Sequence, residues 1–272
     1  MLSWPAAGRA ITGGPPQGGR SQAGRMAQRL LNKVAVVTGA SGVFGRAVVQ
    51  RFLAEGAKVV LFARNRGRLE ELVERAPARV LIVEGDVTRS PDLDGLAQTT
   101  VHRFGGPDVL FVAAEQALPA SLQTSTPELL AEIFAVNFHG ALQTVRAFDR
   151  HLNAGASIAF LTTPTRETSQ PGLGGFAASK AALASMARSL ALELAPRGIR
   201  VNCVAPAFRP TVRATHAIAT GGDETIAKAD RVAKLSARLF EQVADAALFL
   251  ASDEAAGIAG QELIVGSESE ER

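Results

Sequence analysis

Seven short apolar runs, separated by stretches of helical length, constrain the fold of this 272-residue chain more than any other feature. Each run is rich in Val, Ile, Leu or Phe and is apolar at successive positions, which is typical of strands in a parallel sheet that is covered on both faces. The runs are Val34–Val37, Val59–Phe62, Val80–Val83, Val109–Ala113, Ile158–Leu161, Val201–Val204 and Leu263–Val265.

The stretches between these runs carry charges on one side and include Arg46–Glu55, Leu129–His151 and Ser179–Ala195. Parallel neighbouring strands need crossover connections of this length. The pattern therefore predicts an α/β fold: a single Rossmann-type doubly wound domain with a seven-stranded parallel sheet flanked by helices. No linker divides it, and we place this domain at residues 30–267.

The two ends of the chain differ in composition from the rest. Residues 1–29 hold no Asp or Glu and are rich in Gly, Pro and basic side chains, so we expect a disordered basic extension there. Three interpretations are open: an upstream start codon with Met26 as the real beginning, a transit peptide, and a functional basic tail. Gly and Pro disfavour the amphipathic helix that a transit peptide forms. We favour an extension without a specific function. Residues 268–272 form an acidic tail.

Charge and cysteine content argue against several classes of function. The 29 basic and 26 acidic side chains are mixed along most of the chain, which disfavours a nucleic-acid surface. No apolar stretch approaches the roughly 18 residues of a membrane span. Cys203 is the single cysteine and is expected to be buried in the core. One cysteine and four histidines are too few to predict a metal site. We therefore expect a cytoplasmic protein with a small-molecule substrate and neither nucleic acid nor membrane as partner.

A glycine-rich turn, Thr38-Gly39-Ala40-Ser41-Gly42-Val43-Phe44-Gly45, follows the first predicted strand and precedes a helix. Glycines let the backbone turn tightly and approach a pyrophosphate, and the helix N-terminus offers free N–H groups. A tight turn without a ligand is the alternative, but the position in the first strand–helix–strand unit favours a nucleotide. The predicted cofactor-binding residues here are Gly39, Ser41, Gly42, Phe44 and Gly45.

The residues after the second predicted strand indicate which dinucleotide is bound. An acidic residue there would bind the ribose 2′-hydroxyl of NAD, but this chain has Ala63 followed by Arg64, Asn65 and Arg66. Two guanidinium groups attract a 2′-phosphate, so NADP(H) is favoured over NAD(H), with Arg64 as the contact. The alternative is that the arginines cap a solvated loop.

Taken in order, the motifs resemble those of the classical short-chain dehydrogenase/reductase family over about residues 30–266. The resemblance implies seven parallel strands, a nicotinamide cofactor and often a homotetramer built on the helices at Leu129–His151 and Phe176–Ala195. We expect a homotetramer or homodimer, or a heteromer with an active family member. The matching segments are the turn at 38–45, FARN at 62–65, Asp86-Val87, Val136-Asn137, Ser179-Lys180, LALELAPRGIRVNCVAP at 190–206 and ALFLASDEAAGIAGQ at 247–261.

The resemblance also implies a set of catalytic positions. In the family, a Tyr four residues before a Lys exchanges a proton with the substrate oxygen, a Ser thirteen residues before that Tyr bonds to the same oxygen, and an Asn completes a proton relay. The matching residues here are Phe176, Lys180, Thr163 and Asn137, and the chain contains no tyrosine at all. Loss of a general acid typically costs about 10²–10⁴ in rate. For Asn137 the alternative is a polar group that bridges helix and sheet.

Further cofactor positions follow from the same resemblance: Asp86, Val87, Ala114, Lys180, Pro206 and Thr211. Lys180 would hold the nicotinamide ribose, and Thr211 matches a contact to the carboxamide, with a helix N-cap as its alternative. The chain departs from the family at Val43 and Ala207, where the pattern has Gly, at Gly266-Ser267-Glu268 for Asp-Gly-Gly, and at Val112-Ala113-Ala114-Glu115 for Asn-Asn-Ala-Gly.

Glu115 is a candidate substitute for the missing phenol, since a desolvated carboxyl group in this loop could act as an acid. We favour the other interpretation, in which Glu115 points to solvent or pairs with an arginine. His139 and His151 fall on or at the end of a long helix and are expected at the surface or an interface.

Two functions remain. The favoured one is a short-chain-type NADP(H)-dependent oxidoreductase that acts on a small carbonyl, alcohol or imine substrate with impaired or unusual proton donation. The alternative is a catalytically inactive homologue that serves as a partner subunit or an NADP-binding regulatory protein. The first function is supported by Thr163, Asn137, Lys180 and the glycine turn. The second is supported by Phe176, Glu115 and the replaced glycines.

Overall fold

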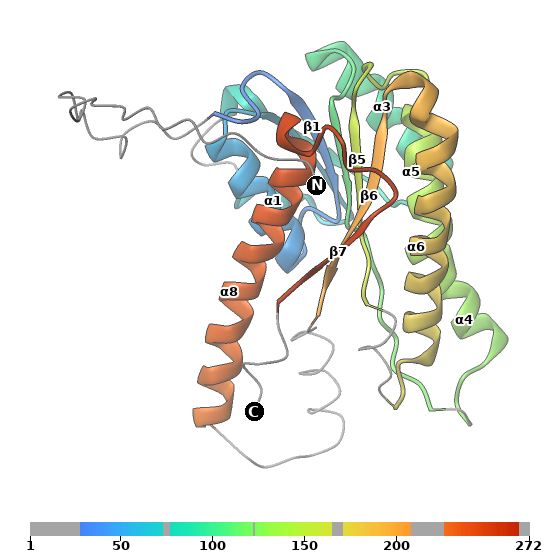
Figure 1. Cartoon of the computed structure of the whole chain (residues 1–272). Coiled ribbons are helices and arrows are strands. Elements are labelled where there is room, and N and C mark those ends of the chain that lie inside the picture. The colour runs from blue at the N-terminus through green and yellow to red at the C-terminus, as the bar shows by residue number, and fades with distance from the viewer. Residues whose placement is uncertain (1–27, 73–76, 122, 165–170, 208–225, 267–272) are drawn as a thin grey trace, which may run out of the picture.

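A single sheet of seven parallel strands organises the molecule, with the strand order β3-β2-β1-β4-β5-β6-β7 (Figure 1). The computed structural model describes residues 28–72, 77–121, 123–164, 171–207 and 226–266. All six neighbouring strand pairs are parallel, so the predicted seven-stranded doubly wound sheet is confirmed. The strands are β1 (Val34–Thr38), β2 (Lys58–Ala63), β3 (Val80–Glu84), β4 (Val109–Val112), β5 (Ser157–Leu161), β6 (Arg200–Pro206) and β7 (Glu262–Val265).

Helices cover both faces of this sheet, which is why its strands are apolar at successive positions. On one face lie α1 (Val43–Ala54) and α8 (Ile226–Ala251), and on the other lie α3 (Ser90–Phe104), α5 (Ala141–Phe148) and α6 (Gly174–Leu194) (Figure 1). Alternate side chains of each strand enter opposite cores. Val37 and Phe111 pack with α1 and α8, whereas Val36 packs with the helices of the other face.

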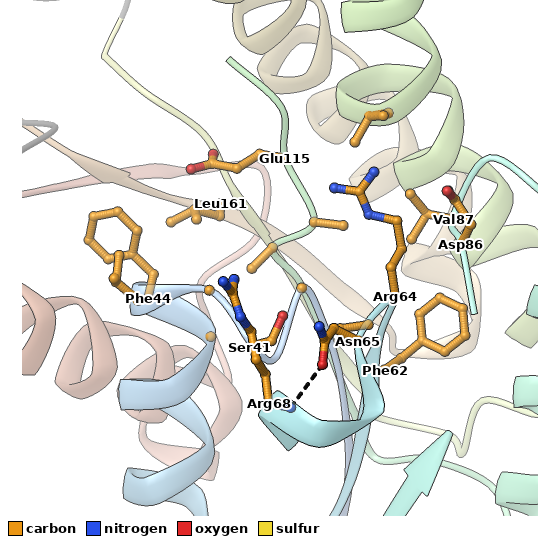
Figure 2. A pocket seen from close by; sticks show the side chains of 18 of the residues that line it. Ser41, Phe44, Phe62, Arg64, Asn65, Arg68, Asp86, Val87, Glu115 and Leu161 are labelled. Atoms are coloured by element: carbon orange, nitrogen blue, oxygen red, sulfur yellow. Dashed lines mark hydrogen bonds between the residues drawn. The ribbon is translucent and has the colours of Figure 1, made fainter. Parts of the chain in front are cut away.

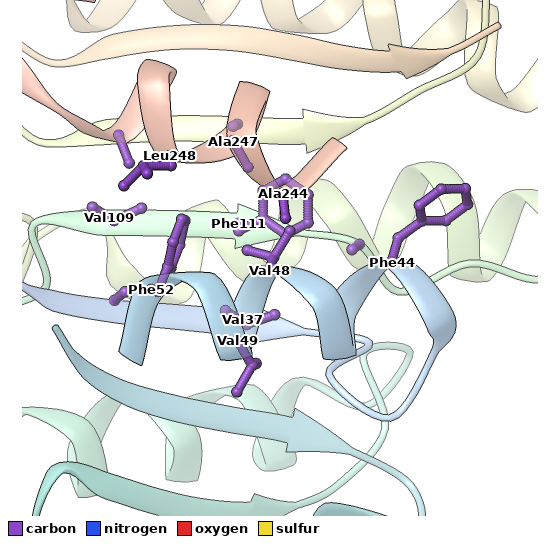
Figure 3. Packing of buried hydrophobic residues seen from close by; sticks show 14 of the residues in the cluster. Val37, Phe44, Val48, Val49, Phe52, Val109, Phe111, Ala244, Ala247 and Leu248 are labelled. Carbon is purple, nitrogen blue, oxygen red and sulfur yellow. The ribbon is translucent and has the colours of Figure 1, made fainter. Parts of the chain in front are cut away.

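The core between the sheet and the α1–α8 pair is built from large aromatic and aliphatic side chains (Figure 3). Phe52 of α1 and Phe111 of β4 are fully buried there, beside Leu248 of α8. Burial of side chains of this size contributes about 1.5–3 kcal/mol each relative to exposure. This core fixes the start of α1, and with it the glycine turn that leads into the helix.

The long helix predicted at Leu129–His151 is present but changes its winding. It begins as α4 (Pro127–Phe134), continues as a π-helical segment η3 (Ala135–Gly140) and ends as α5. Single π-helical turns within α-helices occur frequently at functional sites. The shorter helical elements are α2 (Arg66–Glu70) and the 3₁₀ turns η2 (Pro77–Arg79), η4 (Ala195–Arg197) and η5 (Asp253–Ala255).

The packed part of the chain begins before residue 30. The backbone N–H of Arg29 donates to the Glu55 carboxylate, the Arg29 side chain pairs with Glu254, and Leu30 is fully buried. The remainder of the predicted extension and the acidic tail lie outside the described residues. Within the described ranges, no helix is both long and apolar enough to cross a bilayer, and no cluster of three metal-binding side chains occurs.

Cys203 lies inside β6 and is 2% exposed. Burial, followed by the nearby carboxylate of Glu262, raises the pKa of its thiol to about 12. Because the reactive species is the thiolate, we expect Cys203 to resist thiol reagents at neutral pH in the folded protein and to react fully after unfolding. Labelling kinetics with and without denaturant check this, and labelling of the native protein at the rate of a free thiol would contradict it.

Candidate active site

A pocket of about 340 Å³ opens at the carboxyl ends of the central strands (Figure 2). It lies where the strand order reverses between β1 and β4, the place at which open α/β sheets bind ligands. Nine of the predicted cofactor residues line it: Gly39, Ser41, Gly42, Phe44, Gly45, Arg64, Asp86, Val87 and Ala114.

The glycine turn forms one wall of the pocket. Gly39 has a φ of +66°, and a Cβ there would lie 2.6 Å from the backbone of Ala113 and Ala114. A Cβ on Gly45 would lie 2.3 Å from the carbonyl oxygen of Gly39. The turn therefore packs against the loop after β4 more closely than a side chain allows. The first turn of α1 contains no acidic residue, so its unpaired N–H groups suit an anion such as a pyrophosphate.

Phe44 contributes to this wall differently from its neighbours. Its side chain is buried, and its ring meets that of Phe240 in α8 edge to face, with centroids 5.2 Å apart. The ring therefore anchors the start of α1 in the core while the residue still borders the pocket.

Arg64 and Arg68 line the pocket at the end of β2 (Figure 2). The expectation that Arg66 would be the second guanidinium here is wrong, because Arg66 pairs with Glu70 (2.9 Å) and does not line the pocket. The side chain of Asn65 caps α2 by accepting a hydrogen bond from the Arg68 N–H at 3.0 Å. The sequence signal that could have identified Arg68 is this N-cap at Asn65. It begins a helix at residue 66 and thereby places residue 68 on the side of the glycine turn.

The wall after β3 is formed by Asp86 and Val87. The carboxylate of Asp86 accepts hydrogen bonds from the backbone N–H and the hydroxyl of Thr88, at 2.9 and 2.8 Å. Val87 lies against Gly140 at the end of η3, where an added Cβ would come within 2.7 Å of it. The pocket wall is thus packed directly against the π-helical segment.

Asn137 projects from that segment and is completely buried. Its Oδ1 accepts a hydrogen bond from the backbone N–H of Gln116 (2.7 Å), and its Nδ2 donates to the carbonyl of Gln116 and to the hydroxyl of Ser179, both at 2.9 Å. The hydroxyl of Ser179 donates in turn to the carbonyl of Phe176. Asn137 therefore fastens the loop after β4 to α6, which agrees with its interpretation as a bridging polar group.

Lys180 and Glu115 form a buried ion pair. Lys180 is 1% exposed, and its Nζ lies 2.9 Å from Oε2 of Glu115 and donates to the carbonyl of Leu161 at 2.8 Å. The ring of Phe176 lies 5.7 Å from the same nitrogen. The expectation that Glu115 points to solvent or pairs with an arginine is therefore wrong, because the loop after β4 turns its side chain towards α6.

The remaining predicted residues lie in different places. Thr163, two residues after β5, is buried, and its hydroxyl has no hydrogen-bond partner among the described residues. Buried hydroxyl groups are normally satisfied, so the missing partner makes this hydroxyl a candidate ligand contact. Pro206 is buried at the end of β6 beside Val265 and does not border the described pocket. Thr211 lies outside the described residues.

Comparison with known proteins agrees with this geometry. Residues 39–267 match the family described as enoyl-(acyl carrier protein) reductase. An uncharacterized oxidoreductase of Methylorubrum extorquens is 33% identical over 240 residues, covering 86% of this chain and 96% of that protein. The chain belongs to the short-chain dehydrogenase/reductase family.

Solved structures of short-chain dehydrogenases/reductases (SDRs) share the fold. The glucose/ribitol dehydrogenase of this family from Brucella melitensis superposes with a TM-score of 0.74 at 25% identity, over 87% of this chain and 96% of its own. A short-chain oxidoreductase from Pseudomonas aeruginosa, described as containing an atypical catalytic center, gives 0.77 at 26% identity, over 88% of this chain and 98% of its own. SDR proteins are oxidoreductases that use NAD(P)(H), and this chain is an oxidoreductase of that family.

The residues of this SDR site fit such a dinucleotide. The glycine turn and the α1 N-terminus suit its pyrophosphate, and the pocket runs from the arginines after β2 to Glu115. Lys180, Asn137, Phe176 and Thr163 do not line the described pocket themselves. Lys180 reaches it through Glu115 and Leu161, which do.

Proposed function

We propose that this SDR protein is an NADP(H)-dependent oxidoreductase that acts on a small carbonyl, alcohol or imine substrate and moves its proton without a phenol. The observation that carries the proposal is one continuous pocket, with two guanidinium groups at one end and, at the other, Glu115, whose carboxylate contacts the buried ammonium group of Lys180. The first end supports the choice of dinucleotide, and the second supports the unusual proton chemistry.

Arg64 and Arg68 support NADP(H) because guanidinium groups bind phosphate through charged, often bidentate hydrogen bonds. Both side chains border the pocket, and the part of the structure that is described gives neither an acidic partner. The bound, reduced nicotinamide would supply a hydride to the substrate carbon. The glycine turn and these arginines would hold the dinucleotide in place.

At the other end, Phe176 occupies the position at which the family resemblance predicts a tyrosine. Its benzyl ring has no proton to give, while the buried hydroxyl of Thr163 can donate a hydrogen bond to a substrate oxygen or nitrogen. An iminium carbon already carries the positive charge that a carbonyl acquires only by protonation. Imines are therefore the substrates that this site should reduce most readily.

The arginine assignment is tested by measuring NADPH and NADH affinity calorimetrically for Arg64→Ala and Arg68→Ala. Each variant is expected to lose about tenfold or more in NADPH affinity, the effect of one charged hydrogen bond, with little change for NADH. Arg66→Ala is the matched control, because Arg66 belongs to the same segment but pairs with Glu70. An equal loss in the control, or no binding of NADPH by the parent, would contradict the assignment.

Turnover is tested with a panel of ketones and imines under saturating NADPH. Oxidation of NADPH on at least one substrate is the expected result. If the parent binds NADPH tightly and turns over none of the panel, the site binds the cofactor without catalysis, and the inactive partner or regulatory protein becomes the better description.

A further inference from the structure

The Glu115–Lys180 pair connects the pocket to a buried cation. Lys180 is 1% exposed, whereas the Glu115 side chain is 22% exposed and borders the pocket. Figure 2 shows the Glu115 carboxylate above Leu161, whose carbonyl oxygen accepts the second hydrogen bond of the ammonium group. Water in the pocket can therefore reach the carboxylate, and the carboxylate contacts the ammonium at 2.9 Å.

The position of Glu115 is fixed by the residue that follows it. Both backbone polar groups of Gln116 are held by the side chain of Asn137, and the Gln116 side chain donates to Glu132 of α4. The backbone that carries the carboxylate is thereby attached to η3 and, through Ser179, to α6. The same helix carries Lys180, so one network holds both partners of the ion pair.

The other ionisable groups around Lys180 do not take the place of Glu115. Cys203 of β6 lies close enough to feel the ammonium charge, but a pKa of about 12 keeps its thiol neutral. Glu262 of β7 acts on the same thiol and accepts a hydrogen bond from Thr162, and Arg188 of α6 also faces it. Glu132 of α4 accepts a hydrogen bond from the side chain of Gln116. Glu115 is thus the carboxylate in direct contact with the ammonium in the described part of the chain.

We propose that Glu115 and Lys180 form the proton-transfer pair of this site, an inference that rests on the proposed function. As the C=O or C=N bond of the substrate gains a hydride at carbon, its electron pair moves to oxygen or nitrogen. Glu115, which borders the pocket, takes a proton from Nζ of Lys180 and donates it to that atom, so one N–H bond breaks and an O–H or N–H bond forms. Lys180 is left as a neutral amine and Glu115 as a carboxylate. A hydronium ion of the solvent then protonates Glu115, leaving water, and Glu115 passes this proton to Nζ, which restores the ion pair.

The pair can be tested without cofactor or substrate. The chain has five lysines, so a spectrum of ¹⁵N-labelled lysine Nζ groups is simple, and Lys180→Arg identifies the Lys180 signal. An adjacent carboxylate favours the charged form of an amine. We expect the ammonium signal of Lys180 to disappear at a pH at least about one unit lower in Glu115→Gln than in the parent. Glu128→Gln, which removes an exposed carboxylate from α4 outside this network, is the matched control and should leave the signal unchanged. Identical titration in Glu115→Gln and the parent overturns the proposal.

The second arm measures kcat and NADPH affinity separately. Glu115→Gln is expected to lower kcat for ketone reduction by about 10²-fold, to move the alkaline limb of the kcat profile to lower pH, and to leave the NADPH dissociation constant within about threefold. A second substitution, Phe176→Tyr, should restore kcat in the Glu115→Gln background, because a phenol then supplies the proton. Rescue of this kind is not expected if Glu115 only holds the loop in place.

Three outcomes overturn the proton transfer: an unchanged kcat in Glu115→Gln, a loss of NADPH affinity in proportion to kcat, and failure of Phe176→Tyr to rescue. If Glu115→Gln does not fold, Glu115→Asp retains the charge at a shorter reach and should give an intermediate kcat. Absence of turnover in the parent overturns the proposed function and the proton transfer together. Turnover with the same kcat in Glu115→Gln and the parent overturns the proton transfer alone.

Discussion

Replacing Phe176 with tyrosine is expected to raise kcat for ketone reduction by about 10²-fold, the lower end of the contribution of a general acid. The ring of Phe176 is buried 5.7 Å from Nζ of Lys180, so a phenol there would stand beside a positive charge that favours its ionised form. The gain is placed at the lower end because, in the proposed proton transfer, the Glu115–Lys180 pair already provides a proton. Steady-state kinetics with saturating NADPH measures the change.

The substrate provides the control for this result. An iminium nitrogen becomes a neutral amine when the neighbouring carbon receives the hydride and needs no proton from the enzyme, so its kcat should change by less than about threefold in Phe176→Tyr. Phe176→Leu, which keeps the site apolar, should give no gain with either substrate. Equal gains for ketone and iminium substrates would show that the substitution acts on packing or cofactor binding and not on proton donation.

Gly39→Ala is expected to abolish measurable NADPH binding and to lower the free energy of unfolding by about 3 kcal/mol or more. The φ of +66° at Gly39 is unfavourable for alanine, and the added Cβ would lie 2.6 Å from the backbone of Ala113 and Ala114. The turn must therefore move away from the loop after β4, which changes the phosphate wall of the pocket. Denaturant unfolding and calorimetric titration measure the two effects.

Gly42→Ala is the matched control in the same turn. Gly42 has a φ of −75°, and a Cβ there would meet only the carbonyl oxygen of Gly39, at 3.2 Å. We expect a loss of unfolding free energy below about 1 kcal/mol for this variant. A similar loss of unfolding free energy in both variants would mean that the left-handed backbone and the close approach do not explain why position 39 requires glycine.

The fold could be predicted because the physical signals that define it are local. A strand covered on both faces is apolar throughout, and the five inner strands lie close to sequence runs of this kind and are buried along almost their whole length. The edge strands β3 and β7 were found from their apolar residues although β3 is only partly buried and Leu263 and Ile264 of β7 are exposed. The π-helical winding of η3 was not predicted, because it depends on contacts of Asn137 and Gly140 with distant segments.

The candidate site likewise contains features that the sequence predicts and features that depend on contacts between distant segments. The glycine turn was recognised because its glycines lie directly between a strand and a helix, although the close approach of Gly39 to Ala113 and Ala114 is not visible in the sequence. Arg68 was missed because the N-cap at Asn65 signals only the start of the five-residue helix α2 and not the direction in which the side chain of its third residue points. The contact of Glu115 with Lys180 depends on how the loop after β4 meets α6, and no spacing along the chain encodes that meeting. The roles of Thr163 and Phe176 in chemistry stay predictions.

The sheet also separates the two tasks of the molecule. The glycine turn leads into α1, whose side chains belong to the core shared with α8, whereas Asn137 and Lys180 belong to the helices of the opposite face. A continuous layer of hydrogen-bonded backbone stands between these two cores. Substitutions buried in one core should therefore combine additively, in their effect on the free energy of unfolding, with substitutions buried in the other. The loop after β4 is the exception, because it contacts both the glycine turn and Asn137, so changes in that loop should couple the two cores.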